Sequence, residues 1–106
     1  LYPESEFKKI SDKLAALSQA DVNARNFRRL FFSEATEVVP DKQGRINIAA
    51  RLRQFAGISA DDAQVIVVGV DNYIEIWALD AWNEAQDAVE ENADSMAESL
   101  AKLGVF

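Results

Sequence analysis

The sequence predicts an α+β protein in which about four short strands and a short helix are flanked by longer helices. Apolar residues recur every three or four positions over residues 3–17 and 21–31, which is the helical period. Residues 37–78 instead carry β-branched runs, alternating patterns and turn-forming residues, which are typical of short strands. A further helical stripe over residues 80–103 predicts a long C-terminal helix.

The expected helices begin and end at residues with known positional preferences. Pro3 suits a first helical turn, and Asp21 and Asp80 can each accept a hydrogen bond from a free N–H at a helix start. Gly104 ends the last helix, because glycine readily adopts the left-handed conformation that closes a helix. The apolar stripe of this helix is narrow and includes Asn92, which indicates a helix that docks against a partner.

The first two expected strands are separated by a tight turn. Val38-Val39 is a β-branched run that Pro40 ends, and residues 41–44 have the composition of a turn. Gly44 supplies the positive φ that such a turn requires. Residues 45–48 then alternate polar and apolar side chains, which predicts the outgoing strand.

A short helix and a second hairpin are expected to follow. Residues 49–56 form the helix, with Leu52 and Phe55 facing inward, and Gly57 ends it. The next strands are residues 65–70, which are apolar enough for burial on both faces, and residues 73–78. Asp71-Asn72 between them tolerates left-handed backbone angles and closes the hairpin.

Composition excludes several kinds of active site. The 106 residues include no cysteine and no histidine. This removes disulfides, thiolate nucleophiles, cysteine-ligated metal centres and the commonest general base near neutral pH. No apolar run approaches the ~20 residues that span a bilayer, so we expect no membrane segment. The chain begins with Leu1 rather than methionine, and we expect it to be a piece of a longer product.

Charge is distributed unevenly along a chain whose net charge is −7. All six arginines lie between residues 25 and 53, whereas residues 56–106 carry eleven acidic side chains and only Lys102 as a base. Arg25, Arg28 and Arg29 share one side of the second helix, where they form a possible flanking basic face for phosphate. The alternative is that this face is solvated or paired with carboxylates.

The turn at residues 41–45 is the candidate site. Asp41 lies four residues before Arg45 and can orient its guanidinium across the turn that Gly44 closes. A planar fork held in this way can contact the O6 and N7 of guanine or straddle a phosphate, with Lys42 as a neighbouring phosphate contact. The alternative is a structural pair that stabilises the turn by at most ~1 kcal/mol.

Five sequence blocks occur in an order that resembles the MraZ family of the AbrB-like swapped-hairpin superfamily. The blocks are Asn23–Phe31, Asp41–Ile46, Leu52–Gly57, Val67–Val70 and Ile74–Trp77. The resemblance implies an AbrB-like swapped-hairpin β-barrel unit over residues 37–80, between an N-terminal helical segment (1–36) and a C-terminal docking helix (81–106).

The chain also departs from the family pattern. Family members carry two hairpin copies, each with its own D-x-x-x-R turn, and this chain has one such turn, from Asp41 to Arg45. Leu1-Tyr2-Pro3 resembles the end of the last strand of the first copy, and residues 1–36 would then be the linker that follows it. Ala49 stands where the family commonly has a proline at the start of the short helix.

The resemblance implies a sequence-specific regulator of the bacterial division and cell-wall gene cluster. Such a protein binds direct repeats in double-stranded promoter DNA as a homo-oligomer, in a ring for the intact protein, and it lies in the cytoplasm at the nucleoid. The resemblance implies a repressor, although the sequence does not distinguish repression from activation. We expect no enzyme activity, and no cofactor, metal or small-molecule substrate. The implied DNA-binding residues are Arg45, Lys42, Asp41 and Arg51, while Arg53 fits a subunit interface equally well.

Two other functions remain open at the level of sequence. The acidic second half favours an oligomerising structural or interaction module without direct DNA contact. A small enzyme would need a cation site, for which Asp61, Asp62 and Asp71 offer oxygen ligands, although they lack the spacing of a calcium-binding loop.

Overall fold

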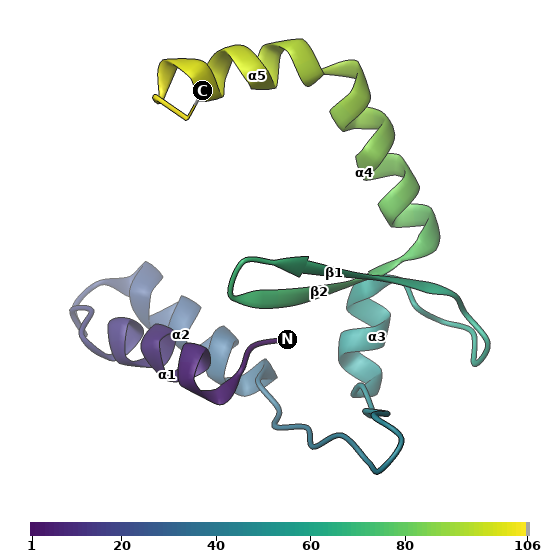
Figure 1. Cartoon of the computed structure of the whole chain (residues 1–106). Coiled ribbons are helices and arrows are strands. Elements are labelled where there is room, and N and C mark those ends of the chain that lie inside the picture. The colour runs from purple at the N-terminus through teal and green to yellow at the C-terminus, as the bar shows by residue number, and fades with distance from the viewer. Residues whose placement is uncertain (106) are drawn as a thin grey trace.

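The computed structural model describes residues 1–105 and contains five helices and a two-stranded antiparallel sheet (Figure 1). In chain order the elements are α1 (Glu4–Ala15), α2 (Val22–Glu34), α3 (Ala50–Ala56), β1 (Val65–Val70), β2 (Tyr73–Ala78), α4 (Leu79–Glu91) and α5 (Ala93–Lys102). The predicted α+β class is therefore correct, although the strands are fewer than expected.

Helices α1 and α2 form a helical hairpin held by phenylalanine rings. Phe7 of α1 stacks on Phe31 of α2 with ring centroids 5.4 Å apart, and Phe32 meets Phe7 edge to face at 6.5 Å. Asp21 caps α2 as predicted, because its Oδ1 accepts the N–H of Ala24 at 3.1 Å. Phe7 and Phe31 are positions that the helical period indicated, whereas the contact of Phe32 was not predicted.

Strands β1 and β2 form the predicted tight hairpin. Val70 pairs with Tyr73 across Asp71-Asn72, and Asp71 has the positive φ of 52° that this turn requires. The expectation that residues 65–70 are buried on both faces is wrong. Their exposure alternates, and Val67 is 63% exposed, because no second layer covers that face within the described chain.

The two strands predicted at residues 38–39 and 45–48 are absent, so the sheet has two strands rather than four. The turn between them does form, but no ladder of hydrogen bonds extends beyond it. Ile46 and Ile48 are still half-buried while Asn47 is exposed, so the alternation that predicted a strand persists in an unpaired segment. An isolated hairpin of this length is marginally stable without a neighbouring strand.

Helix α3 ends where predicted and begins one residue later, at Ala50, but it lacks the predicted inward face. Gly57 ends it with a φ of 76°, and Leu52 is half-buried. Phe55, expected to face inward, is 92% exposed, because no element of the described chain covers that side of the helix. Ala49 provides no side-chain hydrogen bond at the start of α3.

The predicted long C-terminal helix is divided at Asn92 into α4 and α5. Asn92 has φ −112° and ψ 13°, and its Nδ2 donates to the carbonyl of Ala88 at 2.8 Å. An asparagine side chain that bonds to the local backbone competes with the helix, which accounts for the bend. Asp80 is not the cap that was predicted, since α4 begins at Leu79 with Ala78 at the cap position.

The first residues of the chain pair with the free edge of β2. The terminal ammonium of Leu1 donates to the carbonyl of Ile74 at 2.6 Å, and the N–H of Ile74 donates to the carbonyl of Leu1 at 2.9 Å, as in an antiparallel pair. The Tyr2 and Tyr73 rings lie 5.2 Å apart, and Asn72 donates to Glu6 at 3.0 Å. These contacts join the helical hairpin to the β-hairpin.

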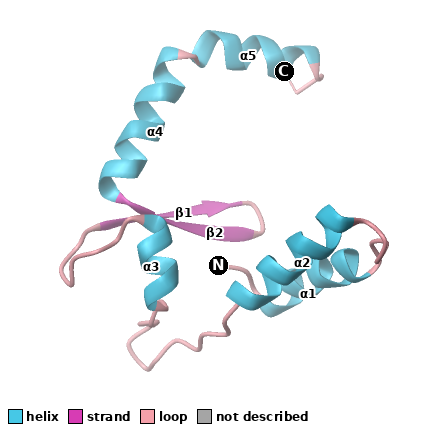
Figure 2. Ribbon diagram, turned by 180° about the vertical axis from the view of Figure 1, so that it is seen from behind, coloured by secondary structure: helices cyan, strands magenta, loops and turns pink. Residues whose placement is uncertain are grey.

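No side chain in residues 1–105 is buried, and the chain has an open shape (Figure 2). Its accessible surface is 8769 Å², whereas a compact monomer of 11.8 kDa is expected to expose about 5,900 Å². Its radius of gyration of 17.3 Å also exceeds the roughly 13 Å expected for its length. Within the described part, no helix is both long and apolar enough to cross a membrane.

The cap of α2 gives a test of this fold. Asp21→Ala removes the acceptor for the Ala24 N–H and should lower the free energy of unfolding by about 1 kcal/mol at fixed protein concentration. Asp21→Asn is the matched control, because asparagine caps a helix about as well as aspartate. Urea denaturation followed by circular dichroism measures both, and equal stability of the two variants would contradict the capping role.

Candidate nucleic-acid interface

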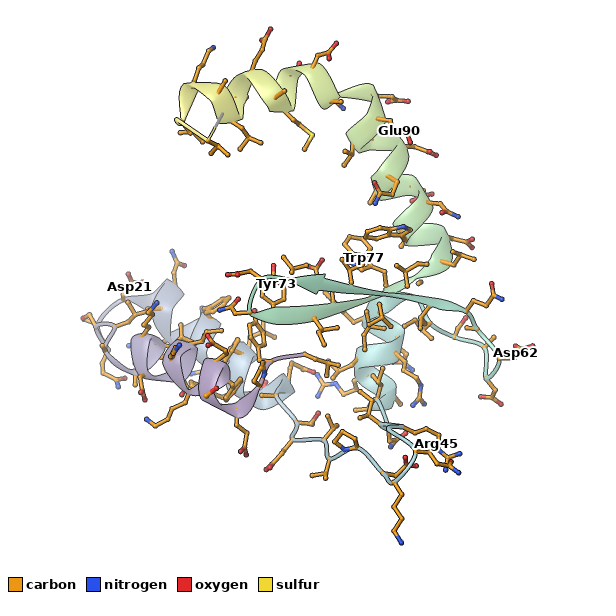
Figure 3. The ribbon with its side chains drawn as sticks, viewed as in Figure 1. Asp21, Arg45, Asp62, Tyr73, Trp77 and Glu90 are labelled. Atoms are coloured by element: carbon orange, nitrogen blue, oxygen red, sulfur yellow. The ribbon has the colours of Figure 1, made fainter. Side chains whose placement is uncertain are left out.

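The turn between α2 and α3, where Figure 3 labels Arg45, is organised by the carboxylate of Asp41. Its Oδ1 accepts the backbone N–H groups of Gln43 at 2.9 Å and Arg45 at 2.8 Å. The backbone groups of Asp41 also bond to Arg45 and Gly44, at 2.9 and 3.0 Å, and Gly44 has the predicted positive φ of 78°. One side chain therefore closes the turn that the sequence indicated.

The other carboxylate oxygen of Asp41 holds the side chain of Arg45. Oδ2 accepts Nε–H of Arg45 at 2.8 Å, and this is the only hydrogen bond of that guanidinium within residues 1–105. The Arg45 side chain is 73% exposed and lies at the outer end of the loop in Figure 3. The two Nη groups are consequently free to bind a ligand while Nε fixes the plane of the fork.

The same hydrogen bonds lower the pKa of Asp41. The backbone N–H of Arg45 contributes most, followed by its guanidinium, because both stabilise the charged carboxylate. Lys42 is exposed beside this pair and forms no ion pair within the described chain. The turn therefore presents two cationic side chains around one carboxylate that stays ionised near neutral pH.

The arginines of α3 are engaged with the segments that precede the helix. Arg51 forms an ion pair with Glu34 at the end of α2, and Arg53 donates to the carbonyl of Ile48. The Arg51 side chain is nonetheless 75% exposed, so it can also face a ligand. The partner Glu34 was missed by sequence reasoning, because it is 17 residues away and no local spacing connects the two.

Two of the three arginines of α2, Arg25 and Arg28, close the turn between α1 and α2, whereas Arg29 donates to Oδ1 of Asn26 within α2 at 3.4 Å. Arg28 donates at 3.3 and 3.4 Å to the carbonyls of Leu14, in the last turn of α1, and Leu17, just beyond it. Arg25 donates to the carbonyl of Gln19 at 3.2 Å. This basic face therefore lies on the helical hairpin, and the start of α2, marked by Asp21, is far from Arg45 in the view of Figure 3.

Asp61, Asp62 and Asp71 are not brought together. Across residues 1–105 no three acidic side chains gather in a way that could hold a metal ion. Figure 3 shows Asp62 on the outer loop that leads into β1, whereas Asp71 lies in the turn at the opposite end of that strand.

Comparison with known proteins shows the family to which the chain is similar. Residues 31–103 match the family described as "MraZ protein, putative antitoxin-like". A "Transcriptional regulator MraZ" of Lactobacillus delbrueckii subsp. bulgaricus is 46% identical over 99 residues, covering 93% of this chain and 67% of the relative. The relatives with this name in Symbiobacterium thermophilum and Halothermothrix orenii are 44% and 39% identical, over 94% and 99% of this chain and 70% and 71% of their own lengths. No solved structure matches the chain significantly.

The chain belongs to the MraZ family, and its relatives are named as regulators of transcription, which is not an enzyme class. The resemblance inferred from the five sequence blocks is confirmed. The family match includes the Asp41–Arg45 turn, helix α3 and the β-hairpin.

The Asp41–Arg45 pair gives a test of the site geometry by pH. Because the pKa of Asp41 is lowered in the folded chain, the stabilisation of the turn is fully present above the ordinary pKa of an aspartate and is lost as the pH falls through the lowered value. An NMR titration of the Asp41 carboxyl group should show a midpoint below the ordinary range. Arg45→Ala should move that midpoint upward. A midpoint in the ordinary range that does not respond to Arg45→Ala would contradict the geometry.

Proposed function

We propose that this chain regulates transcription by binding double-stranded promoter DNA through Arg45 and Lys42. The proposal rests on how the N–H donors of the Arg45 guanidinium are used: one is bound within the described chain, where the others are free. Asp41 takes Nε–H at 2.8 Å, and no other group in the described chain occupies the two Nη atoms. An exposed planar fork of this kind suits the O6 and N7 of a guanine in the major groove.

The remaining polar groups of the turn suit backbone contact. Lys42 is a flexible point charge that can contact a phosphate on either side of the base that Arg45 reads. Asp41 acts as a positioning residue, since its carboxylate is already saturated by Gln43 and Arg45. We propose Arg51 as a flanking contact that exchanges Glu34 for phosphate. The possible flanking face of Arg25, Arg28 and Arg29 is not required for this binding mode.

A chain with a net charge of −7 needs several copies to bind DNA well. We propose a homo-oligomer in which each subunit offers one small cationic turn, so that weak contacts add through effective concentration. In this assembly the neighbouring strands would complete the four-stranded swapped-hairpin barrel over residues 37–80. The domains would then be the linker at 1–36, this barrel unit, and the docking segment at 81–106.

The biological setting that we propose follows from the family. The target is the promoter of the bacterial division and cell-wall gene cluster, with direct repeats as the binding sites and repression as the outcome. The protein would act at the nucleoid in the cytoplasm, without cofactor, small-molecule substrate or enzyme activity. The competing function is an oligomerising module without DNA contact, which the acidic helices α4 and α5 favour.

The test is a binding titration on a duplex chosen from a random pool by the protein itself. Arg45→Ala should weaken specific binding by roughly 1–3 kcal/mol with little change in thermal stability, because the side chain is largely exposed. Arg45→Lys should retain the dependence on salt but lose discrimination between bases, since it keeps the charge and loses the fork.

Lys13→Ala is the matched control for that titration, because Lys13 is exposed on α1 and makes no ion pair within residues 1–105. Its affinity should equal that of the original chain. Full affinity in Arg45→Ala would overturn the assignment of the site. If the original chain selected no duplex at any salt concentration, the non-DNA module would be the better account.

A further inference from the structure

We propose that α5 of one copy of this chain packs in parallel along the exposed face of α2 of a second copy. This proposal specifies an interface for the self-association proposed above, and it does not depend on DNA binding. Two observations indicate that a partner covers these helices. The chain exposes about 2,900 Å² more than a compact monomer of its mass, while a standard interface removes about 800 Å² from each partner. Every residue from 87 to 105 is exposed.

Helix α5 has a face with two different flanks. Ala93, Ala97 and Ala101 recur at four-residue spacing and allow another helix to approach closely. Asp94 and Glu98 lie along one flank of this alanine row. Leu100, 37% exposed, follows the other flank.

The outer face of α2 has a matching pair of flanks. Arg25 and Arg29 lie four residues apart along one side, and Leu30, which is 60% exposed, lies on the other. Asn26 and Ser33 are small or medium polar residues between the two sides. The arginine side borders a shallow hollow of about 600 Å³, whose lining residues are Ala15, Gln19, Arg25, Arg28, Arg29 and Phe32.

The charges on these two faces have no oppositely charged partners in the described chain. The seven carboxylates of α4 and α5 form no ion pair in residues 1–105, and the three arginines of α2 contact carbonyls and amides rather than carboxylates. Asp94 and Glu98 have the same four-residue spacing as Arg25 and Arg29, so two helices side by side can form both pairs at once.

The order of the flanks determines the direction of packing. In the direction of increasing rotation around the helix, α2 presents first its arginines and then Leu30, whereas α5 presents first Leu100 and then its carboxylates. Two facing helices bring opposite flanks together when they run in parallel. Only the parallel arrangement therefore matches arginine with carboxylate and leucine with leucine.

The parallel direction indicates that the α5 that packs on α2 belongs to a second copy and not to the same chain. In Figure 1, α2 runs from left to right and α5 from right to left, so α5 is oriented against its own α2. The apolar side chains also favour a helix rather than nucleic acid as the partner of α2. Phosphates could bind Arg25 and Arg29 but would leave Leu30 and Phe32 exposed to water.

Reciprocal charge reversal tests the interface by sedimentation of the full chain at fixed salt. Arg25→Glu with Arg29→Glu should raise the dissociation constant for self-association by about tenfold, and Asp94→Lys with Glu98→Lys should do the same. A chain with all four substitutions should recover to within about threefold of the original. Arg28 is left unchanged, because it caps α1.

Matched controls separate this effect from net charge. Lys13→Glu on α1, and Asp61→Lys with Asp62→Lys in the loop before β1, change exposed, unpaired charges elsewhere in the described chain and should leave self-association unaltered. Circular dichroism establishes whether each variant keeps its helices. A double variant that loses helix is replaced by the single variant in the same helix, Arg29→Gln or Glu98→Gln, for which a threefold weakening of self-association is expected.

Four results would overturn the proposal. The first is a chain that stays monomeric at all concentrations, and the second is unchanged self-association in both double variants. The third is failure of the variant with all four substitutions to recover self-association. The fourth is loss of DNA affinity in Arg25→Glu with Arg29→Glu while self-association is unchanged. The last result would assign the hollow to phosphate and would leave the DNA-binding proposal intact.

Discussion

The carboxylate of Asp41 is the group on which the shape of the α2–α3 loop depends. It accepts two backbone N–H groups and the Nε–H of Arg45, all at 2.8–2.9 Å, in a segment with no strand and no buried side chain. Without it the five residues from Asp41 to Arg45 would have only two backbone hydrogen bonds to define them. The turn and the orientation of the arginine therefore share one cause, and the pKa of Asp41 is lowered by that same arrangement.

The rest of the molecule is a set of small units that lack a common core. The helical hairpin is held by phenylalanine rings, and the β-hairpin is joined to α4 by the edge-to-face contact of Trp77 and Trp82, at 5.7 Å. Large apolar side chains such as Phe55 and Val39 are 92% and 80% exposed. Burial of such surface is the main favourable term in folding, so a partner that covered these side chains would add to the stability of the chain. In the proposed oligomer, association and DNA binding are consequently coupled.

Local signals in the sequence predicted the local structure well. The cap at Asp21, the positive φ of Gly44 and Gly57, and the hairpin at Asp71-Asn72 are each decided by one or two residues, and all are confirmed. Features that depend on distant partners were not predictable. A strand at 45–48 requires a neighbouring strand to pair with, and burial of Phe55 requires another element to pack against it. The Arg51–Glu34 ion pair joins residues 17 positions apart, a separation that no local pattern indicates. The break at Asn92 was not predicted, because the apolar stripe continues on both sides of this residue. The hydrogen bond of its side chain to the Ala88 carbonyl cannot be read from that pattern.

The most direct measurement is the affinity of Asp41→Asn for the selected duplex. Asparagine keeps the Oδ1 acceptor for Gln43 and Arg45, so the turn persists, but it loses the charged acceptor that fixes Nε. Removal of a negative charge beside DNA would by itself strengthen binding. The account predicts weaker binding, approaching that of Arg45→Ala. Affinity equal to or higher than that of the original chain would contradict it.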